Sequence, residues 1–194
     1  MNDTILHINS SAQTGASRSR KMSQHIVDFF NPQFSKEIIK CDLNNTIPYV
    51  DEIWVAATFT PAENRNQKQI DKLRVSTQLV SELQRADTIV IGTPIYNFNI
   101  PASFKAWIDM IARVGLTFNY TETGPIGLLE NKKVIIAIAS GGVKIGSDHD
   151  FASPYLKQIF GFIGITNVTI IDTNAFDLEK DKSDIQTQLK GVLS

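Results

Sequence analysis

The sequence has only one cysteine, Cys41, so no disulfide bond can form within the chain. A chain without disulfides is typical of a reducing compartment. No apolar run approaches the ~18 residues that a membrane-spanning helix needs, and the first residues lack the charged and apolar regions of a secretory signal. These absences predict a cytoplasmic location and no membrane partner.

The chain also lacks an excess of charge of either sign. Its 19 Lys and Arg residues nearly balance its 20 Asp and Glu residues, which gives a formal net charge of −1. A nucleic-acid-binding domain would carry a strongly basic surface, so we expect no nucleic-acid partner. A chain of 194 residues can build one sizeable hydrophobic core and hardly two, which favours a single domain spanning residues 1–194.

Several sequence signatures of known chemistry are missing. There is neither a P-loop motif nor the glycine-rich fingerprint of dinucleotide-binding domains. The histidines His7, His25 and His149 are scattered, and we find no cluster of metal ligands and no paired nucleophile and base. We therefore expect no metal site and no dedicated catalytic side chain.

What the sequence does contain is a regular alternation of two patterns. Short, mostly apolar runs predict β-strands at Thr4–Asn9, Glu37–Cys41, Thr88–Gly92, Lys133–Ala139 and Val168–Asp172. Amphipathic segments between and after them predict helices at about Ser17–Phe30, Gln67–Gln84, Pro101–Gly115, Pro154–Ile163 and Leu178–Val192. Strands that alternate with helices form parallel sheets with right-handed crossovers. The predicted fold is therefore α/β: a three-layer, doubly wound, five-stranded parallel sheet of the flavodoxin-like type.

Two of these helices carry patterns that specify which side faces the core. Spacings of three and four residues predict one buried face made by Phe104, Trp107, Ile108 and Ile111, and another made by Ile70, Leu73, Leu79, Val80 and Leu83. Lys105, Asp109 and Arg113 lie four residues apart, on a face where their charges can remain in water.

Two long connections have less regular patterns. The segment from Asn44 to Asn66 is too long for a plain connection, so it either carries function or contacts a partner, or forms a short helix at about Asp51–Ala57 that covers an edge of the sheet. In the segment from Leu116 to Leu129, Phe118 and Tyr120 alternate with polar residues, and the glycines and proline that follow predict turns.

The loop after the first strand has the composition of an anion site. Residues 10–20 read SSAQTGASRSR, and residues 4–27 include no Asp or Glu. The loop opens onto a helix N-terminus, where free N–H groups and the positive end of the helix dipole attract an anion, and Ser11, Ser17 and Ser19 can add hydroxyl donors. A phosphate monoester is the expected ligand. In the alternative interpretation, the serines only cap the helix and the two arginines are solvated.

The loops after the third and fourth strands have different chemistry. Tyr96-Asn97-Phe98-Asn99 combines two rings with two amides, which suits a flat heteroaromatic ligand; alternatively, the rings merely fill the core. Ser140-Gly141-Gly142 lets backbone N–H groups approach a ligand closely, or is an ordinary turn. In a doubly wound sheet, the carboxyl ends of the first, third and fourth strands meet at one crevice. Phosphate, ring and backbone contacts in the same crevice together describe FMN.

Three segments resemble the FMN-dependent NADH-azoreductases, which are also described as quinone reductases with a flavodoxin-like fold. They are Pro94–Pro101 (PIYNFNIP), Phe118–Glu122 (FNYTE) and Gly161–Ile165 (GFIGI), within a similarity that covers nearly the whole chain. The resemblance implies one tightly bound FMN per subunit, held by Ser11, Ser17, Arg18, Ser19, Pro94, Ile95, Tyr96, Asn97, Phe98, Ser140, Gly141 and Gly142. It also implies a substrate face lined by Asn99, Phe118, Tyr120 and Phe162, partly across a homodimer.

Two positions depart from the pattern of this family. Ile126 stands where the family often has Glu, and Ser140 stands where it often has Arg. Both departures bear on substrate preference more than on the chemistry.

The resemblance implies a ping-pong oxidoreductase that takes two electrons from NADH or NADPH and passes them to a quinone or an azo compound. The flavin carries the chemistry, so no side chain need act as an acid or base; Tyr120 is interpreted either as a proton donor or as a packing wall. The rival class is a flavodoxin-like electron carrier that docks to a protein partner. Such carriers are usually strongly acidic, and the near-neutral charge of this chain favours the enzyme. A receiver-type signalling domain would need acidic residues after the first strand, where Ser10 and Ser11 stand.

Overall fold

The computed structural model describes residues 4–32, 35–45 and 47–193. Within these ranges, a parallel sheet of five strands has the order β2-β1-β3-β6-β7. The strands are β1 Thr4–Asn9, β2 Glu37–Asp42, β3 Thr88–Pro94, β6 Lys133–Ala139 and β7 Asn167–Asp172. The five predicted strands and the doubly wound, flavodoxin-like topology are confirmed.

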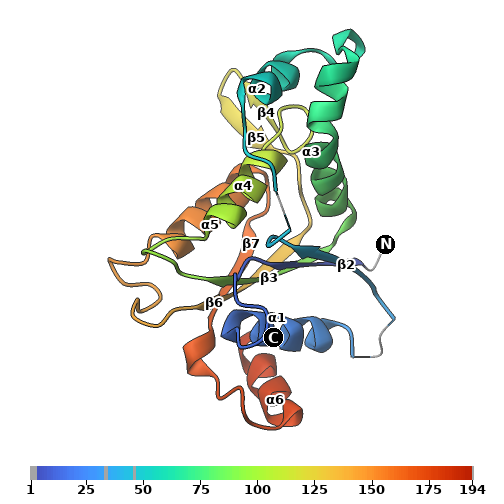
Figure 1. Ribbon diagram of the computed structural model, residues 1–194. Helices are drawn as coiled ribbons and strands as arrows, with labels where there is room; N and C mark the ends of the chain where they lie inside the picture. The colour runs from blue at the N-terminus through green and yellow to red at the C-terminus, as the bar shows by residue number, and fades with distance from the viewer. Residues whose placement is uncertain (1–3, 33–34, 46, 194) are drawn as a thin grey trace.

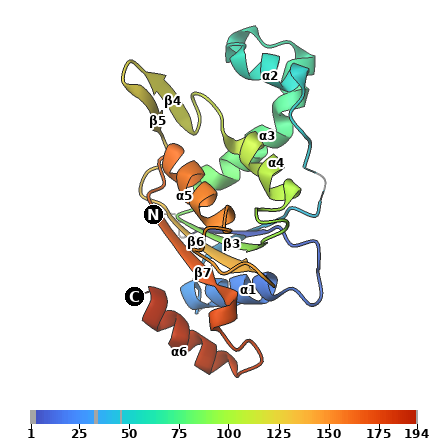
Figure 2. The same ribbon diagram turned by 90° about the vertical axis from the view of Figure 1, so that its left-hand side faces the viewer.

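Helices cover both faces of the sheet. They are α1 Arg18–Phe30, α2 Glu52–Phe59, α3 Gln67–Arg85, α4 Ala102–Ile111, α5 Ala152–Phe162 and α6 Lys182–Leu193. Figures 1 and 2 show α1 and α6 below the sheet and α3, α4 and α5 above it. The last helix begins at Lys182 and not at the predicted Leu178, because Leu178 packs into the lower core before the helix starts.

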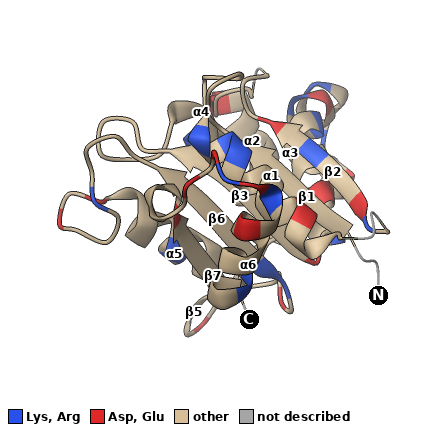
Figure 3. Ribbon diagram, turned by 90° about the horizontal axis from the view of Figure 1, so that it is seen from below, with Lys and Arg blue, Asp and Glu red and all other residues tan. Residues whose placement is uncertain are grey.

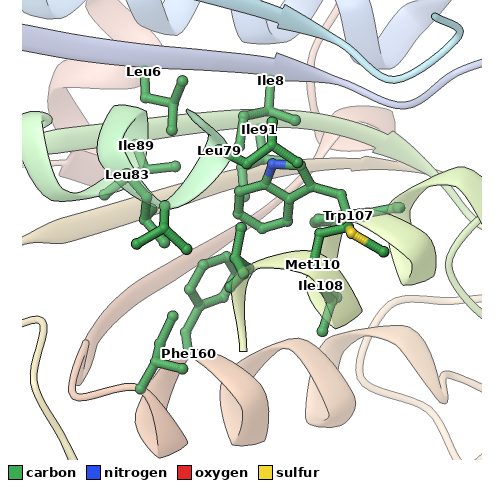
Figure 4. Packing of buried hydrophobic residues seen from close by; sticks show 14 of the residues in the cluster. Leu6, Ile8, Leu79, Leu83, Ile89, Ile91, Trp107, Ile108, Met110 and Phe160 are labelled. Carbon is green, nitrogen blue, oxygen red and sulfur yellow. The ribbon is translucent and has the colours of Figure 1, made fainter. Parts of the chain in front are cut away.

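The core consists of two layers, one on each face of the sheet. Neighbouring strand residues point to opposite faces, so Leu6 packs with the upper helices and Ile5 packs with α1 and α6. Figure 4 shows the upper layer, where the Trp107 ring of α4 lies close to Ile91 of β3, with Phe160 of α5 nearby. Burying a large apolar side chain of this kind contributes about 1.5–3 kcal/mol.

The predicted buried face of α4 is confirmed, since Phe104, Trp107, Ile108 and Ile111 are at most 2% exposed. The prediction for α3 holds for Leu73, Leu79, Val80 and Leu83. It is wrong for Ile70, which is exposed because the first turns of α3 extend above the sheet (Figure 1).

The prediction that Arg113 stays in water is also wrong. Helix α4 ends at Ile111 and not near Gly115, so the four-residue spacing that starts at Lys105 no longer sets the direction of the Arg113 side chain. Arg113 is 3% exposed, donates from Nη1 to Ser76 Oγ of α3 at 2.7 Å, and lies 5.9 Å from the ring centre of Trp54 of α2. Burial lowers the pKa of Arg113 to about 10, so it remains charged at neutral pH and joins three helices.

The segment from Asn44 to Asn66 contains α2 and a short 3₁₀ turn at Ala62–Asn64. A helix close to the predicted one is present, capped by Asp51, whose side chain accepts from the N–H of Trp54. Its predicted position over a sheet edge is wrong. It packs against the upper part of α3, away from the sheet, and its buried residues are Trp54 and Ala57 (Figure 1).

The segment from Leu116 to Leu129 forms an antiparallel hairpin of β4 (Phe118–Thr121) and β5 (Gly124–Gly127). The hairpin is held against the end of α5 by a close backbone contact. A Cβ atom on Gly127 would lie 2.0 Å from the backbone nitrogen of Gly164, so only glycine fits there. The Leu129 N–H donates to the Ile163 carbonyl at 2.9 Å beside this contact.

Candidate functional site

A cavity of about 670 Å³ lies at the carboxyl ends of β1, β3 and β6, the edge at which the sequence places the three loops. It is lined by Ser11, Gln13, Ala16, Ser17, Arg18, Ser19, Pro94, Ile95, Tyr96, Ala139, Ser140, Gly141 and Asn174. Most of the residues predicted to hold the cofactor are therefore brought together. Asn97, Phe98 and Gly142 belong to the same loops but are not among the lining residues.

The loop between β1 and α1 ends in a well-formed helix N-terminus. Ser17 is the N-cap of α1, and its hydroxyl oxygen accepts a hydrogen bond from the N–H of Arg20 at 3.3 Å. The hydroxyl oxygens of Ser17 and Ser19 are 3.1 Å apart and share a hydrogen bond. The N–H groups of Arg18 and Ser19 are in the first turn, where an α-helix provides no acceptors. The serines thus cap the helix and line the cavity, so capping and anion binding are compatible.

The charge around this helix end is positive. Arg18 is the only charged residue among the described residues that line the cavity, and its Nη2 donates to the carbonyls of Thr173 and Phe176 at 2.8 and 2.9 Å. Arg20 forms an ion pair with Asp42 at 2.7 Å. Both arginines are therefore engaged rather than simply solvated. With no carboxylate among these lining residues, the cavity suits an anion.

The loop between β3 and α4 is a tight turn with a strained backbone. The Tyr96 N–H donates to the Asn99 carbonyl at 2.9 Å, and the reverse bond measures 3.1 Å. Between them, Asn97 and Phe98 have φ angles of 49° and 71°, in the left-handed region that favours glycine. Strain of this kind costs about 1–3 kcal/mol and is concentrated at functional sites. Tyr96 and Phe98 are 40% and 52% exposed, so their rings do not fill the core.

The loop between β6 and α5 folds around Ser140. The Ser140 hydroxyl oxygen accepts from the N–H groups of Val143 at 2.8 Å and Gly142 at 3.3 Å. The Ser140 carbonyl accepts from Nδ2 of Asn174 at 2.8 Å. A Cβ atom on Gly141 or Gly142 would meet nothing within 4 Å, so a ligand can approach this backbone closely.

The sequence interpretation missed several lining residues, of which Asn174 is the most informative. Asn174 lies in the short 3₁₀ turn Thr173–Ala175 that follows β7, and it both lines the cavity and donates to the Ser140 carbonyl. A ligand in this type of sheet binds beyond the carboxyl ends of the strands. If this rule is applied to the segment after β7 as well as to the loops after β1, β3 and β6, it indicates Asn174. Gln13, Ala16 and Ala139 carry no comparable signal.

The residues predicted for the substrate face form a separate cluster. The Phe118 ring centre lies 4.4 Å from that of Phe162 and 5.4 Å from that of Tyr120. The hairpin leads into the amino end of β6, and α5 ends at Phe162 just before β7 begins, so this cluster lies at the edge of the sheet opposite the cavity. Figure 2 shows the hairpin at the upper left and the loop between β1 and α1 at the right. Asn99 alone of the four predicted residues lies in a loop of the cavity edge.

The side chains whose pKa values are shifted most lie away from the cavity. Burial raises the pKa of the half-buried Cys41 thiol on β2 to about 12. Burial lowers the pKa of His7 to about 4, and His7 Nε2 lies 2.8 Å from Ser23 Oγ. Neither residue lines the cavity, so these shifts report packing rather than a catalytic acid or base.

Two features are absent from the part of the chain that the structure describes. No three or more His, Cys, Asp or Glu side chains are grouped so that they could hold a metal ion. No helix there combines the length and the apolar character required to cross a membrane.

The sheet order, the layers and the cavity at the strand ends define a flavodoxin-like protein. Residues 3–193 match the family described as having the flavodoxin-like fold. A protein of Jannaschia sp. (strain CCS1) named FMN-dependent NADH:quinone oxidoreductase 1 is 48% identical over 190 residues, which cover 97% of each chain. A protein of the same name from Colwellia psychrerythraea (strain 34H / ATCC BAA-681) is 46% identical over 179 residues, or 92% of each chain. The chain belongs to the flavodoxin-like family of which these oxidoreductases are members.

Solved structures show the same fold. An azoreductase from Bacillus anthracis str. Sterne has a TM-score of 0.79 at 25% identity, with 97% of this chain and 96% of that chain covered. An FMN-dependent NADH-azoreductase from Bacillus anthracis str. Ames Ancestor, solved in complex with FMN, has a TM-score of 0.82 at 24% identity, with 99% and 100% covered. The resemblance stated from the sequence is therefore confirmed at the level of the family and the fold.

Proposed function

We propose that this chain is an FMN-dependent oxidoreductase that takes two electrons from NADH or NADPH and reduces quinones and azo compounds. The observation that carries the proposal is the cavity, where an acid-free helix N-terminus, an exposed tyrosine loop and an open glycine backbone meet at one edge of the sheet. The names of relatives that are 48% and 46% identical support the same activity.

The residues present fit FMN. The hydroxyls of Ser11, Ser17 and Ser19 and the first turn of α1 would hold the phosphate. The loop from Pro94 to Phe98 would face the ring, and the loop from Ser140 to Gly142 would offer backbone groups to its polar edge. The cavity volume of about 670 Å³ lies within the range of about 300–1,000 Å³ that is typical of cofactor sites. We therefore expect one tightly bound FMN per subunit.

The work of the chain is to bind and to position. Bound FMN would supply two-electron chemistry in a ping-pong cycle, in which NAD(P)H and the acceptor occupy the same face in turn. The Ser140 hydroxyl and the Asn174 amide fix the glycine loop, so its N–H groups need no reorganisation when negative charge develops beside them. The Tyr96–Asn99 turn fixes the opposite wall. The orientation of the reactants, and no side-chain acid or base, accounts for the catalysis in this proposal.

We also propose that the protein works as a homodimer. Tyr49, Phe59, Val114 and Tyr120 are all at least 45% exposed, and apolar side chains that gather in one exposed patch mark interaction sites. Phe59, Val114 and Tyr120 surround a cleft of about 170 Å³ next to Trp54 and Phe118. As the resemblance implies, we propose that the Phe118–Tyr120 hairpin of one copy lines the substrate face of the other, which would account for the distance between the hairpin and its own cavity. Light scattering should give twice the mass of one chain, and a fully active monomer would contradict the proposal.

The alternative, an electron carrier that docks to a protein, is less well supported. A docking carrier needs a surface whose charges have one sign, whereas Figure 3 shows Lys and Arg interspersed with Asp and Glu on the lower side of the molecule.

The same mixture of charges supports the proposal that neither nucleic acid nor a membrane is a partner. The single Cys41 supports a cytoplasmic location, and we propose that residues 1–194 act as one domain.

The experiment that tests this function is an absorption spectrum of the purified protein, followed by anaerobic addition of NADH. We expect flavin peaks that bleach with NADH and recover when a quinone is added. A flavin that stays oxidised with both NADH and NADPH would favour the electron carrier. Protein that binds no flavin even after FMN is added would refute the proposed function.

A further inference from the structure

The peptide that follows β1 is held by side chains from outside the cavity. The Ser11 carbonyl oxygen accepts three hydrogen bonds, from Arg20 Nε at 3.2 Å, Arg20 Nη2 at 2.8 Å and Asn44 Nδ2 at 2.9 Å. Neither Arg20 nor Asn44 lines the cavity, although Ser11 does. The Ser11 carbonyl oxygen, which would repel an anion, is therefore hydrogen-bonded to donors that lie outside the cavity.

Asp42, the last residue of β2, completes this arrangement. Its two carboxylate oxygens each accept from the Arg20 guanidinium at 2.7 Å, and one of them accepts from the Asn44 N–H at 3.0 Å. The hydrogen bonds from Arg20 hold the pKa of Asp42 below its ordinary value, so the carboxylate stays ionised at neutral pH. A two-point pair of this kind fixes the plane of the guanidinium. Asp42 thus sets the orientation of Arg20, and the Asp42–Asn44 contact sets the position of Asn44.

The orientation of the carbonyl fixes the orientation of the next N–H group. In a trans peptide, the carbonyl of Ser11 and the N–H of Ala12 point in opposite directions. Consistent with this, the Ala12 N–H donates to the hydroxyl of the cavity-lining Tyr96 at 3.3 Å. If the carbonyl lost its partners, the peptide could rotate and present the carbonyl oxygen to the anion.

We propose that Arg20, Asp42 and Asn44 are positioning residues for the phosphate of the cofactor. They hold the Ser11–Ala12 peptide so that its carbonyl oxygen stays bound to Arg20 and Asn44, away from the phosphate-binding end of the cavity, while its N–H stays bound to the Tyr96 hydroxyl. This inference rests on the proposed function and adds positioning residues from α1 and the end of β2 that lie outside the cavity. The group recognised is the phosphate monoester of FMN, which riboflavin lacks. The positioning residues should therefore affect the affinity for FMN and not the affinity for riboflavin.

The test compares the binding of FMN and of riboflavin to the apoprotein by quenching of flavin fluorescence. The variants are Asp42→Asn and Asn44→Ala, with Asn45→Ala as the matched control because Asn45 is an exposed neighbour whose side chain has no part in this arrangement. We expect Asp42→Asn, which weakens hydrogen bonds between charged groups, to lower FMN affinity by about tenfold or more. Asn44→Ala, which removes the neutral hydrogen bond to the Ser11 carbonyl, should lower FMN affinity by about threefold to tenfold. Riboflavin affinity should change by less than about twofold in both variants. The control should bind both flavins as the unaltered protein does.

An equal loss of FMN and riboflavin would show only general damage to the loop and would overturn the inference, as would unchanged FMN affinity in both variants. Arg20→Lys provides a third variant, because a lysine cannot bridge the Ser11 carbonyl and Asp42 as the guanidinium fork does. The unaltered protein separates the two proposals. If the unaltered protein binds neither flavin, the proposed function itself fails. If the unaltered protein binds FMN but the substitutions leave the ratio of FMN affinity to riboflavin affinity unchanged, only the positioning role fails.

Discussion

Aspartate in place of Ser17 is expected to give a folded protein that no longer retains flavin. Ser17 is the N-cap of α1 and lines the cavity at the proposed phosphate position. Aspartate is as good an N-cap as serine, so the helix should keep its stability. A unit charge about 4 Å from another of the same sign costs about 4 kcal/mol at an effective dielectric constant of about 20, which corresponds to a loss on the order of a thousandfold in affinity.

The control for this substitution is Ser17→Asn, which has the same shape as Ser17→Asp without the charge and is also a good N-cap. The measurement is the flavin content after purification, together with the FMN dissociation constant of the reconstituted apoprotein. Circular dichroism should show the same helix content in both variants. If the aspartate and asparagine variants bind FMN equally well, the phosphate does not lie at Ser17.

A methyl group on Gly127 is expected to slow quinone reduction on the order of a hundredfold while leaving flavin binding intact. The Cβ of Gly127→Ala would lie 2.0 Å from the nitrogen and 2.3 Å from the Cα of Gly164, and both are backbone atoms that cannot rotate away. The hairpin of β4 and β5 must therefore move, and overpacking of this kind costs about 1–3 kcal/mol or more. The cavity is built from other loops, at the opposite edge of the sheet, and should not be affected.

In the proposed homodimer, this displacement moves Phe118 and Tyr120 within the partner's site. A misplacement of about 1 Å can cost on the order of a hundredfold in rate, so we expect a loss of that size in kcat/KM for a quinone. Gly161→Ala, at the same end of α5, is the matched control because its Cβ would meet nothing within 4 Å. Full quinone reductase activity in Gly127→Ala would show that the hairpin plays no part in catalysis.

The sheet and the meeting of three loops were predictable because each depends on local sequence. Buried parallel strands are continuous apolar runs, such as Lys133–Ala139, and the βα order alone places the loops after β1, β3 and β6 at one edge. The anion-site interpretation of Ser11 to Ser19 required only the absence of acidic residues and a helix start.

The features that were not predicted depend on contacts between distant segments. Nothing in the spacing of Arg113 shows that α4 ends two residues earlier, or that Trp54 and Ser76 receive its side chain. The strands of the β4–β5 hairpin are only four residues long, and they are held by the backbone contact of Gly127 with Gly164. These positions are fixed by tertiary packing, which overrides local propensity.

The environment of Cys41 has a consequence for the proposed quinone reductase. Quinones are electrophiles that form covalent adducts with thiolates, and the thiolate rather than the thiol is the reactive form of cysteine. With the Cys41 pKa raised to about 12, fewer than about one thiol in ten thousand is ionised at pH 7. Cys41 is the only cysteine of the chain. In the proposed function, the protein would therefore meet an electrophilic substrate at every turnover without offering it a nucleophilic sulfur to alkylate.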